Sequence, residues 1–302
     1  MLPSAAMKPQ SFAYAAPESV DDVLELLGRH GADAAVLAGG QSLVPMMNLR
    51  LARPGVLVDI NRVPGLGRLE VRDGQLCLGP TVRHRDLETG TGPGELGHLL
   101  ARVAGHVGHL PIRVRGTVAG SLAHADPNAE WPVAVTALGA VLVLASRSGR
   151  RTVHAEDFFD LPFAPVRAAD ELLIEVRIPL PGAGWGGGFA EFAPTAGAFP
   201  TAVVCAGVAV RDGVVAGCRV AAAGLGGRPV RLPGVEAAAA GRPAETLATA
   251  ARAAVDDVRA SRPAAGSQHL AALVAALAGA ALEQAAGRAT SSASSAGGAG
   301  WT

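Results

Sequence analysis

VLAGGQSLVPMMNLRLARPGVLVDINRVPGL, residues 36–66, holds the turn on which the fold depends. The apolar run at 34–40 predicts a short buried strand that ends in the paired glycines Gly39 and Gly40. Glycines let the backbone approach a bulky anion and turn its N–H groups toward it, and Ser42 adds a hydroxyl donor. The segment therefore predicts either a phosphate-binding loop or an ordinary tight turn. It lacks both the Gly-Lys-Ser/Thr of a P-loop and the G-x-G-x-x-G fingerprint of dinucleotide-binding folds.

A second loop of small residues lies in HLPIRVRGTVAGSLAHADPNAEWP, residues 109–132. It brings Gly116, Thr117, Gly120 and Ser121 together within a few positions. An extended dinucleotide needs several backbone donors around its diphosphate. We therefore expect the two loops to close on one diphosphate group.

The segments around the first loop predict a small α/β lobe. Residues 18–30 carry an apolar stripe with helical spacing, Ser19 is placed as the N-cap, and Gly31 is placed to end the helix. A further short apolar strand is expected at 56–60. Strands and a helix in such close order indicate an α/β lobe over residues 1–60.

The next part of the chain predicts a second lobe built on a mixed sheet. Alternating apolar residues at 68–80 surround the turn Asp73-Gly74, which is the pattern of a β-hairpin. Residues 171–180 alternate as another strand. The second lobe is therefore expected over residues 61–180.

The last third of the chain has a different composition. PGAGWGGG at 181–188 predicts a flexible connector. It leads into a C-terminal domain over 181–290, with an antiparallel sheet and helices, and then a disordered low-complexity tail at 291–302. The fold class is therefore α+β in three parts. Strands are expected at 201–210 and 214–222, and helices at 235–241, 244–258 and 267–287.

The composition excludes several classes of function. The chain has 302 residues, 49% of them hydrophobic and 17% charged, which is typical of folded domains. With 26 basic and 26 acidic residues it has no net charge to attract nucleic acid. Cys77, Cys205 and Cys218 lie far apart, which argues against zinc or iron–sulfur ligation within this chain and indicates a reducing cytoplasm. No signal peptide or transmembrane segment is expected, because polar residues interrupt the most apolar stretch, 264–286.

Together the two loops resemble the FAD-binding (medium) subunits of the xanthine dehydrogenase and carbon monoxide dehydrogenase family. The most diagnostic segments are AGGQSLVPMMNLRL and IRVRGTVAGSLAHADPNAEWP. The similarity continues in order through most of the chain, in KPQSFAYAAPESVDDVLELL near the start, LGPTVRHRDLE at 78–88, DELLIEVRIPLP at 170–181, AAAGLGGRPVRLPGVEAAAAG at 221–241 and SQHLAALVAAL at 267–277.

This resemblance implies a PCMH-type fold that holds FAD non-covalently between the first two lobes. The diphosphate would lie on residues 38–42 and 117–121. Glu130 resembles the acidic FAD ligand of the family, with Asp126 as the alternative carboxylate, and Leu173 would lie near the flavin. No residue is assigned a catalytic or metal-binding role. The implied cofactor-binding residues are Leu37, Ala38, Gly39, Gly40, Gln41, Ser42, Leu43, Thr117, Ala119, Gly120, Ser121, Asp126, Glu130 and Leu173.

The resemblance also implies a function in electron transfer. Family members work beside a molybdopterin-binding large subunit and a small subunit with two [2Fe–2S] clusters, in an assembly expected to be a dimer of heterotrimers. Electrons would pass from those clusters to FAD and then to an external acceptor. A stand-alone flavin oxidoreductase and an assembly scaffold that has lost FAD remain alternatives. The substrate stays open among carbon monoxide, aldehydes, purines and N-heterocycles.

Two positions depart from the family pattern. The second loop usually reads T-[IV]-G-G-[SDN], and here Ala119 stands at the first of those glycines. A methyl group at a left-handed backbone position would cost roughly 1 kcal/mol. Many relatives also carry a basic residue near Ala193, and its loss predicts a lower flavin potential. His84, His98, His106, His109 and His124 have no metal-ligand spacing and are expected to be surface or hydrogen-bonded histidines. The alternative for His109 and His124, which flank the second loop, is that they reach the flavin.

Overall fold

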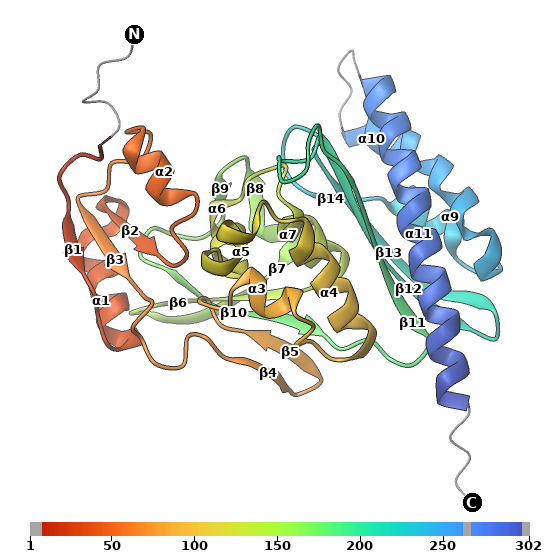
Figure 1. Ribbon diagram of the computed structural model, residues 1–302, viewed down its shortest axis with the longest axis horizontal. Coiled ribbons are helices and arrows are strands. Elements are labelled where there is room, and N and C mark those ends of the chain that lie inside the picture. Colours follow the sequence, from red (N-terminus) through yellow and green to blue (C-terminus); the bar gives the residue numbers. More distant parts are fainter. Residues whose placement is uncertain (1–7, 262–266, 298–302) are drawn as a thin grey trace, which may run out of the picture.

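The computed structural model describes residues 8–261 and 267–297, in which three larger sheets follow one another along the chain and a two-stranded sheet lies beside them (Figure 1). The first is parallel, in the order β1 (Ala13–Ala15), β3 (Val56–Asp59), β2 (Ala34–Leu37). Helix α1 (Val20–His30) packs against it through buried Val23 and Leu27.

The local signals around α1 explain its ends. The Ser19 hydroxyl accepts a hydrogen bond from the Asp22 amide at 3.1 Å, as an N-cap does. Gly31 follows the helix with φ of 52°, a conformation that favours glycine. The predicted helix and the strands on either side of the first loop are confirmed.

The second sheet has five strands in the order β4-β5-β10-β6-β7. The predicted hairpin is present, with Asp73 and Gly74 at φ of 51° and 72°. The prediction of a mixed sheet is wrong for this lobe, because every pairing in it is antiparallel. Two hairpins form its edges and β10 returns between them, so no parallel crossover is needed. The strands are β4 (Leu69–Arg72), β5 (Gln75–Leu78), β6 (Val141–Ser146), β7 (Gly149–His154) and β10 (Leu172–Pro179), beside a small pair, β8 (Phe159–Leu161) and β9 (Ala164–Pro165).

A group of short helices lies between this sheet and the third one (Figure 1). One hydrophobic core joins Leu142 and Val176 of the second sheet, Leu99 and Trp131 of the helices, and Phe189 of the third sheet. Since the core is continuous, the helices that carry the second loop are held from both sides. These helices are α3 (His84–Glu88), α4 (Gly94–His106), α5 (Leu110–Arg115), α6 (Val118–His124), α7 (Glu130–Ala137) and α8 (Ala155–Phe158); α2 (Leu43–Asn48) follows the first loop.

The third sheet is antiparallel, in the order β11-β12-β13-β14, and helices cover its outer face (Figure 1). The two strands predicted around Asp212-Gly213 are present. The expected helix at 244–258 is instead a 3-10 segment followed by an α-helix. The strands are β11 (Trp185–Phe192), β12 (Ala202–Arg211), β13 (Val214–Ala223) and β14 (Val230–Arg231), and the helices are α9 (Pro233–Ala239), η3 (Ala244–Ala253), α10 (Ala254–Ser261) and α11 (Ser267–Gly297).

The predicted flexible connector at 181–188 is wrong over its second half, because Trp185 begins β11. Its glycines have a packing role. A β-carbon on Gly186 or Gly188 would overlap the backbone of α11 at Ala285 and Ala281. The absence of side chains there lets strand and helix approach closely.

The predicted disorder at 291–302 is also wrong in part, because α11 continues to Gly297; residues 298–302 lie outside the described residues. Residues 291–297 extend a helix whose preceding part is rich in Ala, the residue with the highest helix propensity. Within the described residues, one helical segment, Gln268–Ser291, is long enough and apolar enough to cross a membrane. Its buried face, which includes Val274 and Leu282, packs in the core of the third sheet, so packing against that sheet accounts for its apolar composition.

Candidate functional site

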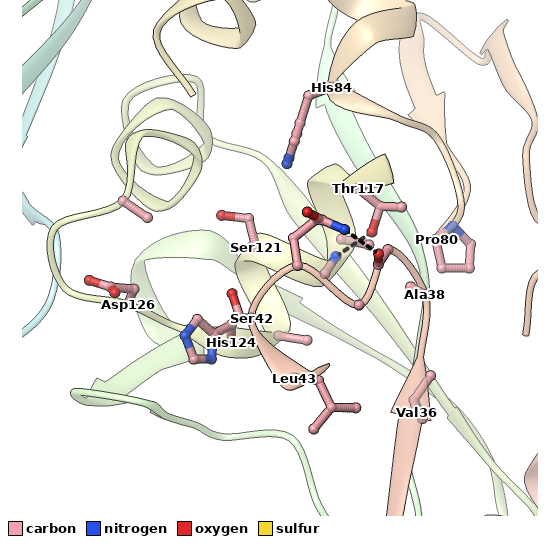
Figure 2. A pocket seen from close by; sticks show the side chains of 18 of the residues that line it. Val36, Ala38, Ser42, Leu43, Pro80, His84, Thr117, Ser121, His124 and Asp126 are labelled. Atoms are coloured by element: carbon pink, nitrogen blue, oxygen red, sulfur yellow. Dashed lines mark hydrogen bonds between the residues drawn. The ribbon is translucent and has the colours of Figure 1, made fainter. Parts of the chain in front are cut away.

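A cavity of about 590 Å³ lies where the first lobe meets the second, and both predicted loops line it (Figure 2). Leu37 alone among the predicted site residues does not line it. Its carbonyl instead accepts hydrogen bonds from Ile60 and Asn61 behind the loop. The predicted residues that do line the cavity are Ala38, Gly39, Gly40, Gln41, Ser42, Leu43, Thr117, Ala119, Gly120, Ser121, Asp126, Glu130 and Leu173.

The first loop leaves β2 and turns at Gly40, whose φ of 73° favours glycine. Gln41 stabilises the turn, because its side-chain amide donates to the Gly39 carbonyl at 3.1 Å. Among the described residues, no group accepts a hydrogen bond from the backbone amides of Gly39, Gly40, Gln41 or Ser42. The loop therefore offers a row of free N–H donors to an anionic ligand.

The two loops touch through their backbones. A β-carbon on Gly39 would overlap the Arg115 carbonyl and lie 2.7 Å from the Cα of Gly116. Gly39 has no positive φ, so it is needed for close approach and not for an unusual turn.

Asn61 and Arg83 form a second connection, here called the loop brace. The Asn61 side-chain amide donates to the Ala38 carbonyl of the first loop at 2.8 Å. The Arg83 guanidinium donates to Asn61 Oδ1 at 2.5 Å and to the Arg115 carbonyl beside the second loop. Asp59 orients Asn61, because its Oδ1 accepts from the Asn61 backbone amide at 2.9 Å. The brace therefore sets the distance between the loops before any ligand binds.

The second loop leads directly into α6. Thr117 caps that helix, with its hydroxyl accepting from the Gly120 amide at 3.0 Å. Ala119 lies inside α6 with an ordinary negative φ and is buried. The backbone strain considered for an alanine at this position does not arise.

The two predicted carboxylates differ in environment. Glu130 begins α7 and is only 4% exposed, and burial raises its pKa to about 7, with the charge of Glu191 adding to the effect. Asp126 Oδ1 accepts from the Asn128 amide at 2.9 Å in a local turn. Glu130 is therefore able to hold a proton near neutral pH, whereas Asp126 shapes the loop.

Several residues of the cavity were not predicted. Arg167 lines it and donates to the Glu171 carbonyl at 2.6 Å, and no sequence motif marks it. Ala193 does not line the cavity, although the nearby Phe199 does. His84 also lines the cavity, and it lies within LGPTVRHRDLE, one of the segments that carry the family resemblance. That segment is a sequence signal from which His84 could have been predicted. Of the two histidines considered beside the second loop, His124 lines the cavity and His109 does not. The other lining residues that were not predicted include Pro80, Ile112, Glu171, Gly197 and Ala198.

The donor set and the volume fit an elongated nucleotide cofactor. The volume lies within the usual range of small-molecule sites, roughly 300–1,000 Å³. Free backbone amides come from the first loop and a helix cap comes from the second, and the buried carboxyls of Asp126, Glu130 and Glu171 also line the cavity. Among the described residues, no group of three His, Cys, Asp or Glu side chains is placed to hold a metal ion.

Comparison with known proteins agrees with this geometry. A family described as the FAD binding domain in molybdopterin dehydrogenase matches residues 10–181. The chain is 38% identical over 230 residues to the nicotine 6-hydroxylase medium subunit of Paenarthrobacter nicotinovorans, covering 76% of this chain and 80% of that one. It is 35% identical over 238 residues to the caffeine dehydrogenase subunit beta of Pseudomonas sp. strain CBB1, covering 78% and 81%. A solved chain of the Hydrogenophaga pseudoflava carbon monoxide dehydrogenase superposes with a TM-score of 0.85 at 33% identity, over 93% of this chain and 99% of that one.

Proposed function

The chain belongs to the family of FAD-binding medium subunits of molybdenum hydroxylase-type dehydrogenases, and from this premise we propose that it receives electrons from [2Fe–2S] clusters of a partner subunit and delivers them to an external acceptor. FAD supplies the redox chemistry when bound, while the protein supplies position and electrostatics. The observation that supports this most strongly is the single cavity lined by both loops.

The residues of the cavity have binding roles in this proposal. The free amides of residues 39–42 and the Thr117–Ser121 turn would hold the diphosphate. Glu130 would hydrogen-bond the cofactor further along the cavity, and the loop brace keeps both loops in place. Among the described lining residues, no nucleophile is paired with a base. The chain's own residues therefore bind and orient the cofactor without transforming a substrate.

In this proposal another subunit of the complex determines the substrate. The relatives are named for nicotine and caffeine, and the solved structure for carbon monoxide, which are chemically unlike one another. A shared flavoprotein fold among such different substrates favours substrate chemistry on a partner. We assign that chemistry to a molybdopterin-binding large subunit, with a small iron–sulfur subunit between the two, in a cytoplasmic dimer of heterotrimers.

The test is purification of the affinity-tagged chain from its native host, with flavin and metal analysis of each polypeptide. We expect FAD on this chain, and molybdenum and iron on two co-purifying polypeptides. A tagged Gly39→Ala chain, with its stability checked by thermal unfolding, shows whether the complex still assembles when flavin binding is weakened. A chain that purifies alone and whose FAD is rapidly reduced by a small substrate would contradict the proposal, as would a complex without flavin.

A further inference from the structure

His84 lies behind the second loop and has one ring nitrogen free to act on a ligand. It begins α3, is 4% exposed, and lines the cavity. Its backbone amide donates to the Gly116 carbonyl at 3.0 Å. The ring packs so closely under the loop that a β-carbon on Gly116 would lie 2.8 Å from Nε2.

Trp131 determines which ring nitrogen carries the proton. Its indole Nε1 donates to His84 Nδ1 at 2.9 Å within the core. Because an indole N–H can only donate, Nδ1 must present a lone pair. Burial, together with the charges of Arg113 and Arg83, lowers the pKa of His84 to about 4. The ring is therefore neutral at physiological pH, and its single proton is on Nε2.

The Nε2–H group has no acceptor in the part of the chain that the structure describes. Among the described residues, the side-chain polar atom that is both fully buried and without a hydrogen-bond partner is Glu191 Oε2. His84 Nε2 is therefore not sealed from solvent. Figure 2 shows the ring extending from its helix toward the space that Ser121 and Thr117 also face. A buried histidine that served only the core would not need a donor directed into the cavity.

We propose that His84 is a fixed, neutral hydrogen-bond donor to the bound cofactor: Nε2–H donates to an acceptor oxygen of FAD, and Trp131 is the positioning residue that selects this tautomer. The inference rests on the proposed function, because it requires FAD in this cavity. A neutral donor adds a hydrogen bond to the cofactor without adding a charge to the cavity.

The experiment is an FAD titration of the purified apo-protein in wild-type, His84→Leu and His84→Gln forms. Loss of one neutral hydrogen bond is expected to weaken binding by about 10-fold in His84→Leu. His84→Gln keeps an amide donor near the position of Nε2, so its Kd should stay within about 3-fold of wild type. Thermal unfolding of each apo-protein shows whether the variants fold.

A second measurement does not depend on removing the histidine. In ¹⁵N-histidine NMR spectra, wild-type His84 should carry its proton on Nε2 and its signal should shift when FAD is added. Trp131→Phe should give a mixture of tautomers. A proton on Nδ1, or equal Kd values for His84→Leu, His84→Gln and wild type, would overturn this inference alone. A wild-type chain that does not bind FAD would overturn the proposed function as well.

Discussion

A β-carbon on Gly39 would lie 2.7 Å from the Cα of Gly116, so the two loops meet backbone to backbone with no room for a side chain. Segments from two different lobes thereby form one wall of the cavity. The loop brace, through Asn61 and Arg83, holds the same two segments from behind.

Replacing Gly39 by Ala should separate the loops. Because the added methyl meets backbone atoms that cannot rotate away, we expect apo-protein stability to fall by about 1–3 kcal/mol and FAD affinity to fall at least about 10-fold. Chemical denaturation and FAD titration measure the two effects. Gly105→Ala, on the exposed side of α4 with open space around it, is the matched control and should leave both nearly unchanged. Equal FAD binding by the two variants would refute the role given to Gly39.

The loop brace should act as a unit. Asn61→Ala and Arg83→Ala should each weaken FAD binding. The loss of binding free energy in the double variant should be smaller than the sum of the losses in the two single variants, by a coupling energy on the order of 1 kcal/mol. Four Kd values form the required double-mutant cycle. Arg62→Ala, an exposed cation next to Asn61, serves as the control for lost charge. Strictly additive effects would show that the two side chains do not work together.

Glu130 should make the apo-protein less stable as pH rises. Its pKa is raised from 4.5 in the unfolded chain to about 7 in the fold, so the folded state holds a proton that the unfolded state has lost. Stability from this group is complete below about pH 4.5 and is lost as pH passes through 7, amounting to about 3 kcal/mol. Glu130→Gln should remove this decline. Parallel denaturation of the two proteins at pH 5.5 and pH 8 is the measurement, and an identical pH dependence would contradict the pKa given to Glu130.

Ala193 should keep the flavin potential low. A cation introduced by Ala193→Lys would stabilise the anionic reduced flavin, and we expect the midpoint potential of bound FAD to rise on the order of 20 mV. Spectroscopic redox titration measures the change. Ala193→Gln, long but uncharged, controls for side-chain bulk. No difference between the Lys and Gln variants would mean that charge at this position does not reach the cofactor.

Gly188 should be needed for the contact of β11 with α11. Its β-carbon would overlap the Ala281 carbonyl, so Gly188→Ala should destabilise the protein by about 2 kcal/mol or more. Gly217 on β13 has only an ordinary contact, with Ala209 at 3.9 Å, and Gly217→Ala should change stability by less than about 1 kcal/mol. Urea denaturation distinguishes them, and similar midpoints would contradict the packing role.

Local signals in the sequence predicted the parts of the fold that local chemistry controls. Ser19 and Gly31 mark the ends of α1, and Asp73-Gly74 forms the expected hairpin turn. The family resemblance identified both loops, and all but one of the site residues that it implied line the cavity. The loop contact at Gly39 also agrees with the expectation that the loops converge.

The errors lie where distant segments decide the structure. The glycines of 181–188 suggested flexibility, whereas α11, far along the chain, makes them packing positions. Strand β1 forms by pairing with β3 and has no strong pattern of its own. Arg167 reaches the cavity through tertiary folding alone, without a motif to mark it.

Hydrogen–deuterium exchange of the apo-protein with and without FAD tests the shared site most directly. One equivalent of FAD should slow exchange at the backbone amides of residues 39–42 and of residues 117–121 together, over the same range of FAD concentration. Protection of one loop while the other exchanges as in the apo-protein would contradict a single site formed by both.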